Sequence, residues 1–312
     1  MPTPYVTPQM LQNAPTGISW SIIPFPKASD QAQLAEQTNI CWRATSIVDT
    51  YCNQVLRATV DNEQLSGPGN ARVGVQQGTG NGLLIMRRWP VTEVLAIQTA
   101  LNAGFPRVWS VIPPGQYEVE HPLINTYTDT ASATAPDGGM SVLVAPNYVT
   151  WARGRNATRL LVSYVNGWPH TSLTVAAEAG ATVLTVDDVT GFTDATAFVY
   201  DGATTETVSV SAVTADSPLS LPFDVGTVQA GPGTLALDAP LAHAHAIGVA
   251  VSTLPADVLW ASALAAATQA LESGTTSITV QNLPGSFTAG GHGVSDLTDE
   301  YKRLLDPFRR II

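Results

Sequence analysis

The sequence predicts an α+β protein, in which a helical core with a long N-terminal helix and short strands carries an inserted all-β domain of the barrel or sandwich type. Three observations lead to this class. A long stretch near the N-terminus contains no Gly or Pro, the composition changes between Thr171 and Ser252, and helical periodicity returns after Pro255. Chains that switch between these periodicities in separate blocks are typical of the α+β class.

The first block predicts one long helix over residues 30–59. Ser29 or Asp30 can cap its start, and no Gly or Pro interrupts it. Apolar residues recur at spacings of three and four, which gives a single stripe for ring or helix packing. The members of this stripe are Ile40, Ala44, Ile47, Tyr51 and Val55. At this length the helix would reach about 45 Å, which suggests a strut. A shorter helix is expected to begin at Thr7–Pro8, with Thr7 as its N-cap.

Short strands are expected after this helix. A stretch rich in Gly breaks the chain first, and it reads LSGPGNARVGVQQGTGNG. The strand-like runs that follow are LLIMRRW, TEVLAIQTAL, RVWSVI, QYEVE, MSVLVAP and ATRLLVSYVNGW. Proline cannot donate a ladder hydrogen bond, so the prolines between these runs mark strand ends or sheet edges.

The segment 171–252 differs from the rest of the chain in charge and in periodicity. It contains no Lys or Arg, and it has nine acidic residues, whereas the remainder has 16 acidic and 14 basic residues. Apolar and polar residues alternate along it, and Asp201–Gly202 is a hairpin signal. We therefore expect an acidic all-β domain. Clamping of duplex DNA by this segment is not expected, because that would require cations.

Helices resume in the last block. Residues 256–272 form a strong helical pattern that Pro255 opens and Gly274 ends, and a strand, a Gly-rich loop and a helix over 295–306 follow. The predicted organisation is a core of residues 1–170 and 253–312, with 171–252 as the inserted domain. An insertion of this kind needs its two ends close together, near Trp168 and Pro255.

No residue pattern points to catalysis. The nucleophile-elbow, phosphate-loop and zinc-protease motifs are absent from the sequence. His243-x-His245 places two imidazoles on one strand face, but no Cys or suitably spaced carboxylate accompanies them, so we expect strand-end or turn histidines rather than a metal site. We expect no enzyme activity, no cofactor and no metal.

The sequence also bears on the compartment. No run of 18 apolar residues occurs, and Met1–Val6 lacks the basic and apolar parts of a signal peptide. We therefore expect no membrane span and folding in a cytoplasm.

Cys41 and Cys52 lie about 16 Å apart on the predicted helix, too far for a disulfide, so buried free thiols are expected.

The flanking segments resemble the head–tail connector, or adaptor (head-completion), family of tailed bacteriophages. The residues that carry the resemblance are YVTPQMLQ, IVDTYCNQVL, LLIMRRWPVTEVLAI, LLVSYVNGW, LPADVLWASALAAATQAL and LLDPFRR. They cover about residues 1–170 and 253–312. In that family the strand end and the following helix start are separated by a few residues, whereas here about 85 residues separate them. This departure is consistent with an insertion.

The resemblance implies a structural virion protein with a helical connector core. It implies a homo-oligomeric ring of about twelve subunits beneath the portal protein, in the neck at the capsid vertex, assembled in the host cytoplasm. Such a ring extends the channel for double-stranded DNA, without sequence-specific binding, and docks a stopper or tail-completion protein. The family's C-terminal segment reaches the portal. In this chain it corresponds to Leu304, Leu305, Phe308, Arg309, Arg310, Ile311 and Ile312. We expect removal of Asp306–Ile312 to weaken portal docking and to leave folding intact.

An alternative function remains at this point. The chain could be a phage host- or carbohydrate-binding structural protein, with the β insert as its binding module. The insert has few aromatic residues for such a role, namely Phe192, Phe198, Tyr200 and Phe223.

Overall fold

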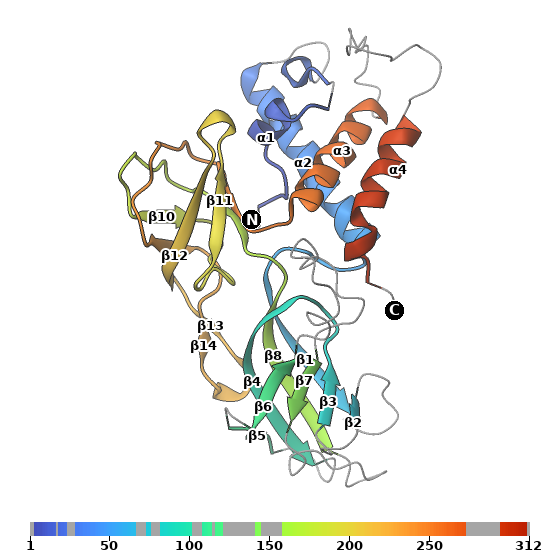
Figure 1. Ribbon diagram of the computed structural model, residues 1–312, viewed down its shortest axis with the longest axis vertical. Coiled ribbons are helices and arrows are strands. Elements are labelled where there is room, and N and C mark those ends of the chain that lie inside the picture. Colours follow the sequence, from blue (N-terminus) through green and yellow to red (C-terminus); the bar gives the residue numbers. More distant parts are fainter. Residues whose placement is uncertain are drawn as a thin grey trace, which may run out of the picture. The chain divides into compact units, whose positions relative to one another are not determined.

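The computed structural model of the chain describes residues 3–16, 18–23, 29–66, 73–75, 82–101, 108–113, 116–120, 141–144, 158–272 and 294–310 (Figure 1). These residues form two compact units. The first contains Met1–Arg57, Pro169–Thr214 and Pro232–Ile312, and the second contains Ala58–Trp168 and Ala215–Gly231. The segment 171–252 thus contributes to both units. The division into residues 1–170, 171–252 and 253–312 stays a prediction, which a deletion would test.

The predicted fold class is wrong. The chain is mostly β, with several sheets, one of them a half-barrel, and the described residues contain four short α-helices rather than a helical connector core with a long N-terminal helix. The error has a physical cause. A stretch without Gly and Pro can form a helix, but the absence of these residues does not determine how far the helix continues. β-branched residues pair equally well in a sheet when partner strands are present.

The expected helix over residues 30–59 ends early. Helix α2 (Asp30–Cys52) begins as predicted, with the Ser29 side chain accepting a hydrogen bond from the backbone N–H of Ala32. It stops at Asn53, which adopts the left-handed conformation with φ 55°. Asn tolerates this conformation better than most residues, and the left-handed residue closes the last turn of the helix. The chain then continues into strand β1 (Thr59–Ser66).

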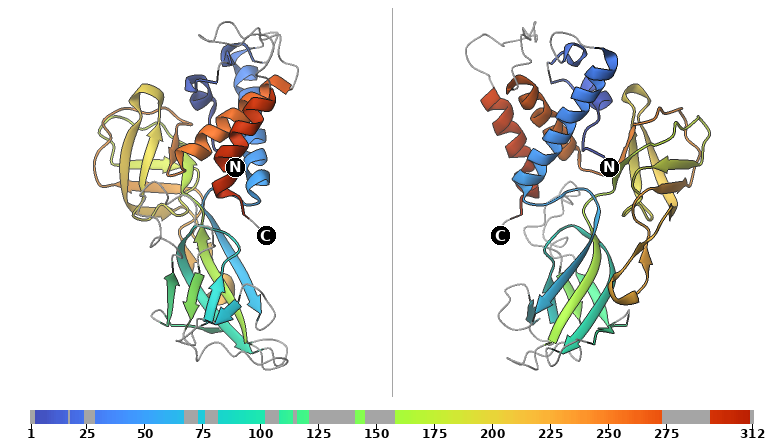
Figure 2. Two further views of the ribbon diagram at one scale, coloured as in Figure 1. Left: turned by 45° about the vertical axis from the view of Figure 1, so that its right-hand side comes forward. Right: turned by 180° about the vertical axis from the view of Figure 1, so that it is seen from behind.

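The helices of the first unit come from both ends of the chain. Helix α1 (Pro8–Asn13) has Thr7 as N-cap and Pro8 in its first turn. Helices α3 (Ala256–Glu272) and α4 (Val294–Leu305) pack against α2 and against each other (Figures 1 and 2). Helix α3 is buried on nearly all sides from Val258 onward, and many of its residues are Ala. Small side chains let neighbouring helices approach closely, which explains an apolar helix between two others.

The same unit contains a six-stranded sheet; we refer to it as the β module. Its strands, in spatial order, are β10 (Val183–Val186), β15 (Gly233–Leu237), β12 (Glu206–Ala215), β11 (Thr196–Tyr200), β16 (Ala250–Ser252) and β9 (His170–Ser172). Leu173 pairs with Val186, which joins the two ends of the sheet. Burial alternates along β10 and β11, so every second side chain enters the interior.

The second unit contains two four-stranded antiparallel sheets. One has the order β1, β8 (Thr158–Asn166), β4 (Val91–Leu101) and β5 (Ser110–Val111). The other has the order β2 (Val73–Val75), β3 (Gly82–Ile85), β7 (Ser141–Val144) and β6 (Tyr117–Glu120). Because β8 lies between β1 and β4, it supplies the centre of the first sheet.

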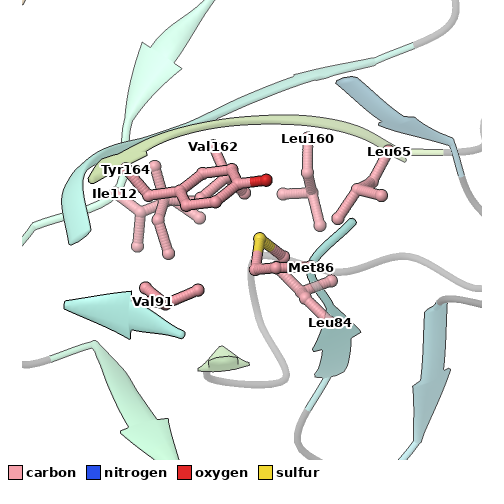
Figure 3. Packing of buried hydrophobic residues seen from close by; sticks show 9 residues of the cluster. Leu65, Leu84, Met86, Val91, Ile112, Leu160, Val162 and Tyr164 are labelled. Carbon is pink, nitrogen blue, oxygen red and sulfur yellow. The ribbon is translucent and has the colours of Figure 1, made fainter. Parts of the chain in front are cut away.

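A hydrophobic cluster joins these two sheets. Strand β8 contributes Leu160, Val162 and Tyr164, which share one face because side chains alternate along a strand. Figure 3 shows Leu160 and Tyr164 directed to the same side as Met86, which lies close to Leu84 of the other sheet. The sheets therefore bury one common core.

The opposite face of β8 is covered by residues from the segment 215–231. This segment forms a hairpin of β13 (Leu219–Ser220) and β14 (Thr227–Val228), with a short 3-10 helix over Pro222–Asp224. Leu221 and Val228 of the hairpin are buried with Val165 and Ala58. A piece of the acidic segment is thus part of the core of the second unit.

Two smaller findings concern membrane spans and cysteines. No helix in these ranges combines the length and the apolarity needed to cross a bilayer. Cys41 and Cys52 are free and buried, and burial raises the pKa of each thiol to about 12.

Candidate functional site

The predicted portal-docking segment begins with the last two residues of α4 and folds onto the end of α2. Leu305 and Phe308 are buried, with 0% and 1% of their surface exposed. Leu304 and Arg310 are half-buried and Arg309 is exposed, whereas Ile311 and Ile312 lie outside the described residues. Two of the predicted docking side chains are therefore core residues of the first unit.

Four contacts hold this segment against the end of α2. The Tyr51 hydroxyl donates a hydrogen bond to Asp306 at 2.5 Å, and the Arg309 guanidinium carbon lies 5.4 Å from the centre of the Tyr51 ring. The Gln54 side chain donates to the carbonyl oxygen of Phe308 at 3.2 Å. The backbone N–H of Arg310 donates to the carbonyl oxygen of Cys52 at 2.9 Å. This last bond satisfies one of the carbonyls that the end of a helix leaves free.

The electrostatics of this contact favour a neutral Tyr51. Desolvation, together with the hydrogen bond from its hydroxyl and the charge of Asp306, raises the pKa of Tyr51 to about 12. The cation of Arg309 over the ring opposes this shift. Tyr51 therefore stays a hydrogen-bond donor over the physiological pH range.

The residues predicted for ring or helix packing lie in different environments. Ile40 is buried, Ile47 and Tyr51 are half-buried, and Val55 is half-buried beyond the end of α2. The buried face of α2 shares Ile40 and Ala44 with the predicted stripe but is otherwise made of different residues. Its members are Gln37, Ile40, Cys41, Ala44, Thr45, Val48 and Cys52. Packing of the predicted residues between subunits stays a prediction.

The two histidines of His243-x-His245 lie in different environments. The side chain of His245 is fully buried between Asp201 and Glu206, whereas His243 is exposed. Among the described residues, no group of three or more His, Cys, Asp or Glu side chains is arranged to hold a metal ion.

A second cluster, which the sequence did not indicate, is centred on Tyr5 and His170. The Tyr5 hydroxyl donates to Asp49 and accepts from the backbone N–H groups of Leu56 and Arg57. His170 is bonded through Nε2 to the carbonyl oxygen of Pro4 and through Nδ1 to the hydroxyl of Ser252, each at 2.8 Å. The N-terminal segment thus fastens to both the helices and the β module. No local pattern marks these partners, because they are far apart in sequence.

Comparisons with known proteins assign no function to these residues. The chain matches no protein-family model, no curated protein and no solved structure.

Proposed function

We propose that the chain is a structural, non-catalytic subunit of the neck of a tailed bacteriophage. In this role it forms a head-to-tail adaptor ring beneath the portal protein, extends the DNA channel and docks the stopper or tail-completion protein. The resemblance described above motivates the proposal.

The observation that carries the proposal is the packing of helices from opposite ends of the chain. Helix α2 contacts α3 and α4, although more than 200 residues separate α2 from α3 (Figure 2). The segments that resemble the adaptor family lie on both sides of the inserted β strands. Four of these six segments, all except LLIMRRWPVTEVLAI and LLVSYVNGW, belong to one unit, which supports the idea that they act together, with the β module as an addition.

The strand residues that carry the resemblance also meet. Strand β4, from VTEVLAI, pairs along its length with β8, from LLVSYVN. Beyond their ends, the Trp89 and Trp168 rings lie edge to face at 6.1 Å, and the N–H of Gly167 donates to the carbonyl oxygen of Pro90. The two motifs are therefore parts of one structural element.

A native mass measurement of the full chain, alone and mixed with its portal protein, tests the proposal. We expect a closed ring, either for the chain alone or once the portal is present. A chain that stays monomeric in both samples would contradict the proposal.

The docking contact can be tested separately with two arginine variants. Arg309 is exposed and lies in the predicted docking segment, whereas Arg303 is 68% exposed on α4 and pairs with Glu300. We expect Arg309→Glu to weaken portal binding at least about tenfold, because a reversed charge at an interface opposes the partner's potential. Arg303→Glu is the matched control and should bind as the wild type does. Equal effects of both variants would argue against docking through this segment.

One observation favours the alternative of a host- or carbohydrate-binding protein. Phe198 is 44% exposed on the outside of β11, and its ring lies 5.8 Å from that of Tyr200. Aromatic rings offer rigid contact area to a ligand. Binding to a glycan array that Phe198→Ala abolishes, and that Val183→Ala at another exposed position of the module retains, would support this alternative.

A further inference from the structure

His245 lies between two carboxylates inside the β module. Its Nδ1 is 2.9 Å from Oδ2 of Asp201, and its Nε2 is 2.8 Å from Oε1 of Glu206. The His245 side chain is fully buried, and each carboxylate is 14% exposed. Both ring nitrogens are therefore occupied, and water has little access to them.

This arrangement requires a particular protonation state. An ionised carboxylate only accepts hydrogen bonds, and a neutral imidazole has a single N–H. While both carboxyl groups are ionised, both contacts can be hydrogen bonds only when both ring nitrogens carry protons. If one proton leaves, a nitrogen lone pair faces a carboxylate oxygen at less than 3 Å, which is repulsive in a buried site.

The two carboxylates connect His245 to other elements. Glu206, at the start of β12, also accepts from the backbone N–H groups of Ala242 at 2.8 Å and of His243 at 3.0 Å. Asp201, after β11, accepts from the side chain of Gln9 on α1. The three side chains thus join the loop before β16, the β11–β12 hairpin and the N-terminal helix.

We propose that Asp201, His245 and Glu206 form a proton-dependent clamp that closes this end of the β module and seats α1 on it. The clamp is closed when the His245 ring carries two protons and opens when it loses one. In the closed state one positive charge lies between two negative charges. In the open state the two negative charges remain without a cation between them.

The neighbouring titratable groups leave His245 as the residue whose protonation opens and closes the clamp. Among the described residues of the elements that carry the clamp, the other titratable side chains are Tyr200 on β11, Glu178 beside the residue that pairs with His245, and His243 on its own loop. Glu178 and His243 are exposed, Tyr200 is half-buried, and α1 has no titratable side chain. Burial acts to raise the pKa of Glu206, but the hydrogen bonds from Ala242, His245 and His243 lower it below its ordinary value. The carboxylate therefore stays ionised under mildly acidic conditions.

Nitrogen NMR of the histidine rings, combined with amide hydrogen exchange, tests the clamp in the full chain. Both are followed from about pH 5 to about pH 9, which covers the range of about pH 5 to about pH 8 in which histidines ordinarily change charge. We expect protection of the Ala242 and His243 amides, corrected for intrinsic exchange, to fall at least about tenfold as the two-proton signal of His245 disappears. Protection that persists while His245 is a single neutral tautomer would overturn the proposal.

Variants separate the clamp from general stability. His245→Gln should lose the protection and its pH dependence, whereas His243→Gln, at the exposed neighbouring histidine, should keep both. If His245→Gln does not fold, Glu206→Gln replaces it and should remove the two-proton signal of His245. Gln9→Ala should speed exchange at Leu11 of α1 and leave Ala242 protected. Loss of the pH dependence in His243→Gln, or its survival in Glu206→Gln, would refute the assignment.

Discussion

The hydroxyl of Tyr51 donates a 2.5 Å hydrogen bond to Asp306, which joins the last turn of α2 to the turn that follows α4. These residues are 255 positions apart in the sequence. The bond belongs to the set of contacts that folds the C-terminal segment onto its own chain. Any role of this segment in binding a partner starts from that folded position.

Replacement of Tyr51 by Phe removes this bond and keeps the ring beneath Arg309. We expect the free energy of unfolding to fall by about 1 kcal/mol, the usual net value of one hydrogen bond at a partly exposed site. Urea denaturation at neutral pH measures it. An unchanged denaturation midpoint would mean that water replaces this hydrogen bond without loss of stability.

Replacement of Phe308 by Ala tests whether the C-terminal segment belongs to the core. Phe308 is 1% exposed, so we expect a loss of about 3–5 kcal/mol, as is typical for a buried Phe. Leu34→Ala, at a residue that is 55% exposed, is the control and should cost far less. The buried position of Phe308 disagrees with the sequence-based expectation that removal of Asp306–Ile312 leaves folding intact. We now expect that truncation to destabilise the first unit.

Two leucines of one hairpin test the role of residues 215–231. Leu221 is 7% exposed and packs with Val165, whereas Leu219 is 46% exposed. Leu221→Ala should lower the stability of the second unit by about 2–5 kcal/mol, and Leu219→Ala should have a much smaller effect. Hydrogen exchange of the β8 amides reports the change. Equal exchange in both variants would show that the hairpin is not part of this core.

His170 predicts a loss of stability in acid. Burial lowers the pKa of His170 from 6.5 to about 4, because the folded protein disfavours a charged ring there. The unfolded chain then binds more protons between these two values. The stabilisation is present above pH 6.5 and is lost as the pH falls towards about 4, with a total of up to about 3 kcal/mol.

The measurement for this prediction is denaturation at a series of pH values for the wild type and His170→Gln. The variant should show a flatter dependence between pH 4 and 6.5. His243→Gln, at an exposed histidine, should retain the wild-type slope. A wild-type slope in His170→Gln would contradict the role assigned to the buried ring.

Local signals in the sequence predicted several helix ends. Thr7 and Ser29 are N-caps of α1 and α2, and α3 spans residues 256–272 as expected. The strands of β11 and β12 form an antiparallel hairpin around Asp201–Gly202. Such features depend on a few neighbouring residues, on capping hydrogen bonds and on turn conformation, so they are readable from the chain.

The candidate site was only partly predictable. The C-terminal segment was identified through a resemblance, but burial of Leu305 and Phe308 against the chain's own helices could not be inferred from it. His245 was noted for its spacing from His243, whereas its actual partners are 39 and 44 residues away. Distant side chains meet only when the sheet register places them together.

The sequence by itself determined where helices begin, which segment lacks cations, and which stretches alternate as strands. The tertiary structure decided that α2 ends at Cys52, that the chain is mostly β, and that residues 215–231 complete the core of the second unit. The physical reason is the range of the interactions. Caps and turns are settled within a few residues, whereas strand pairing and burial depend on partners far along the chain, such as Thr59 and Asn166 in the register of β1 and β8.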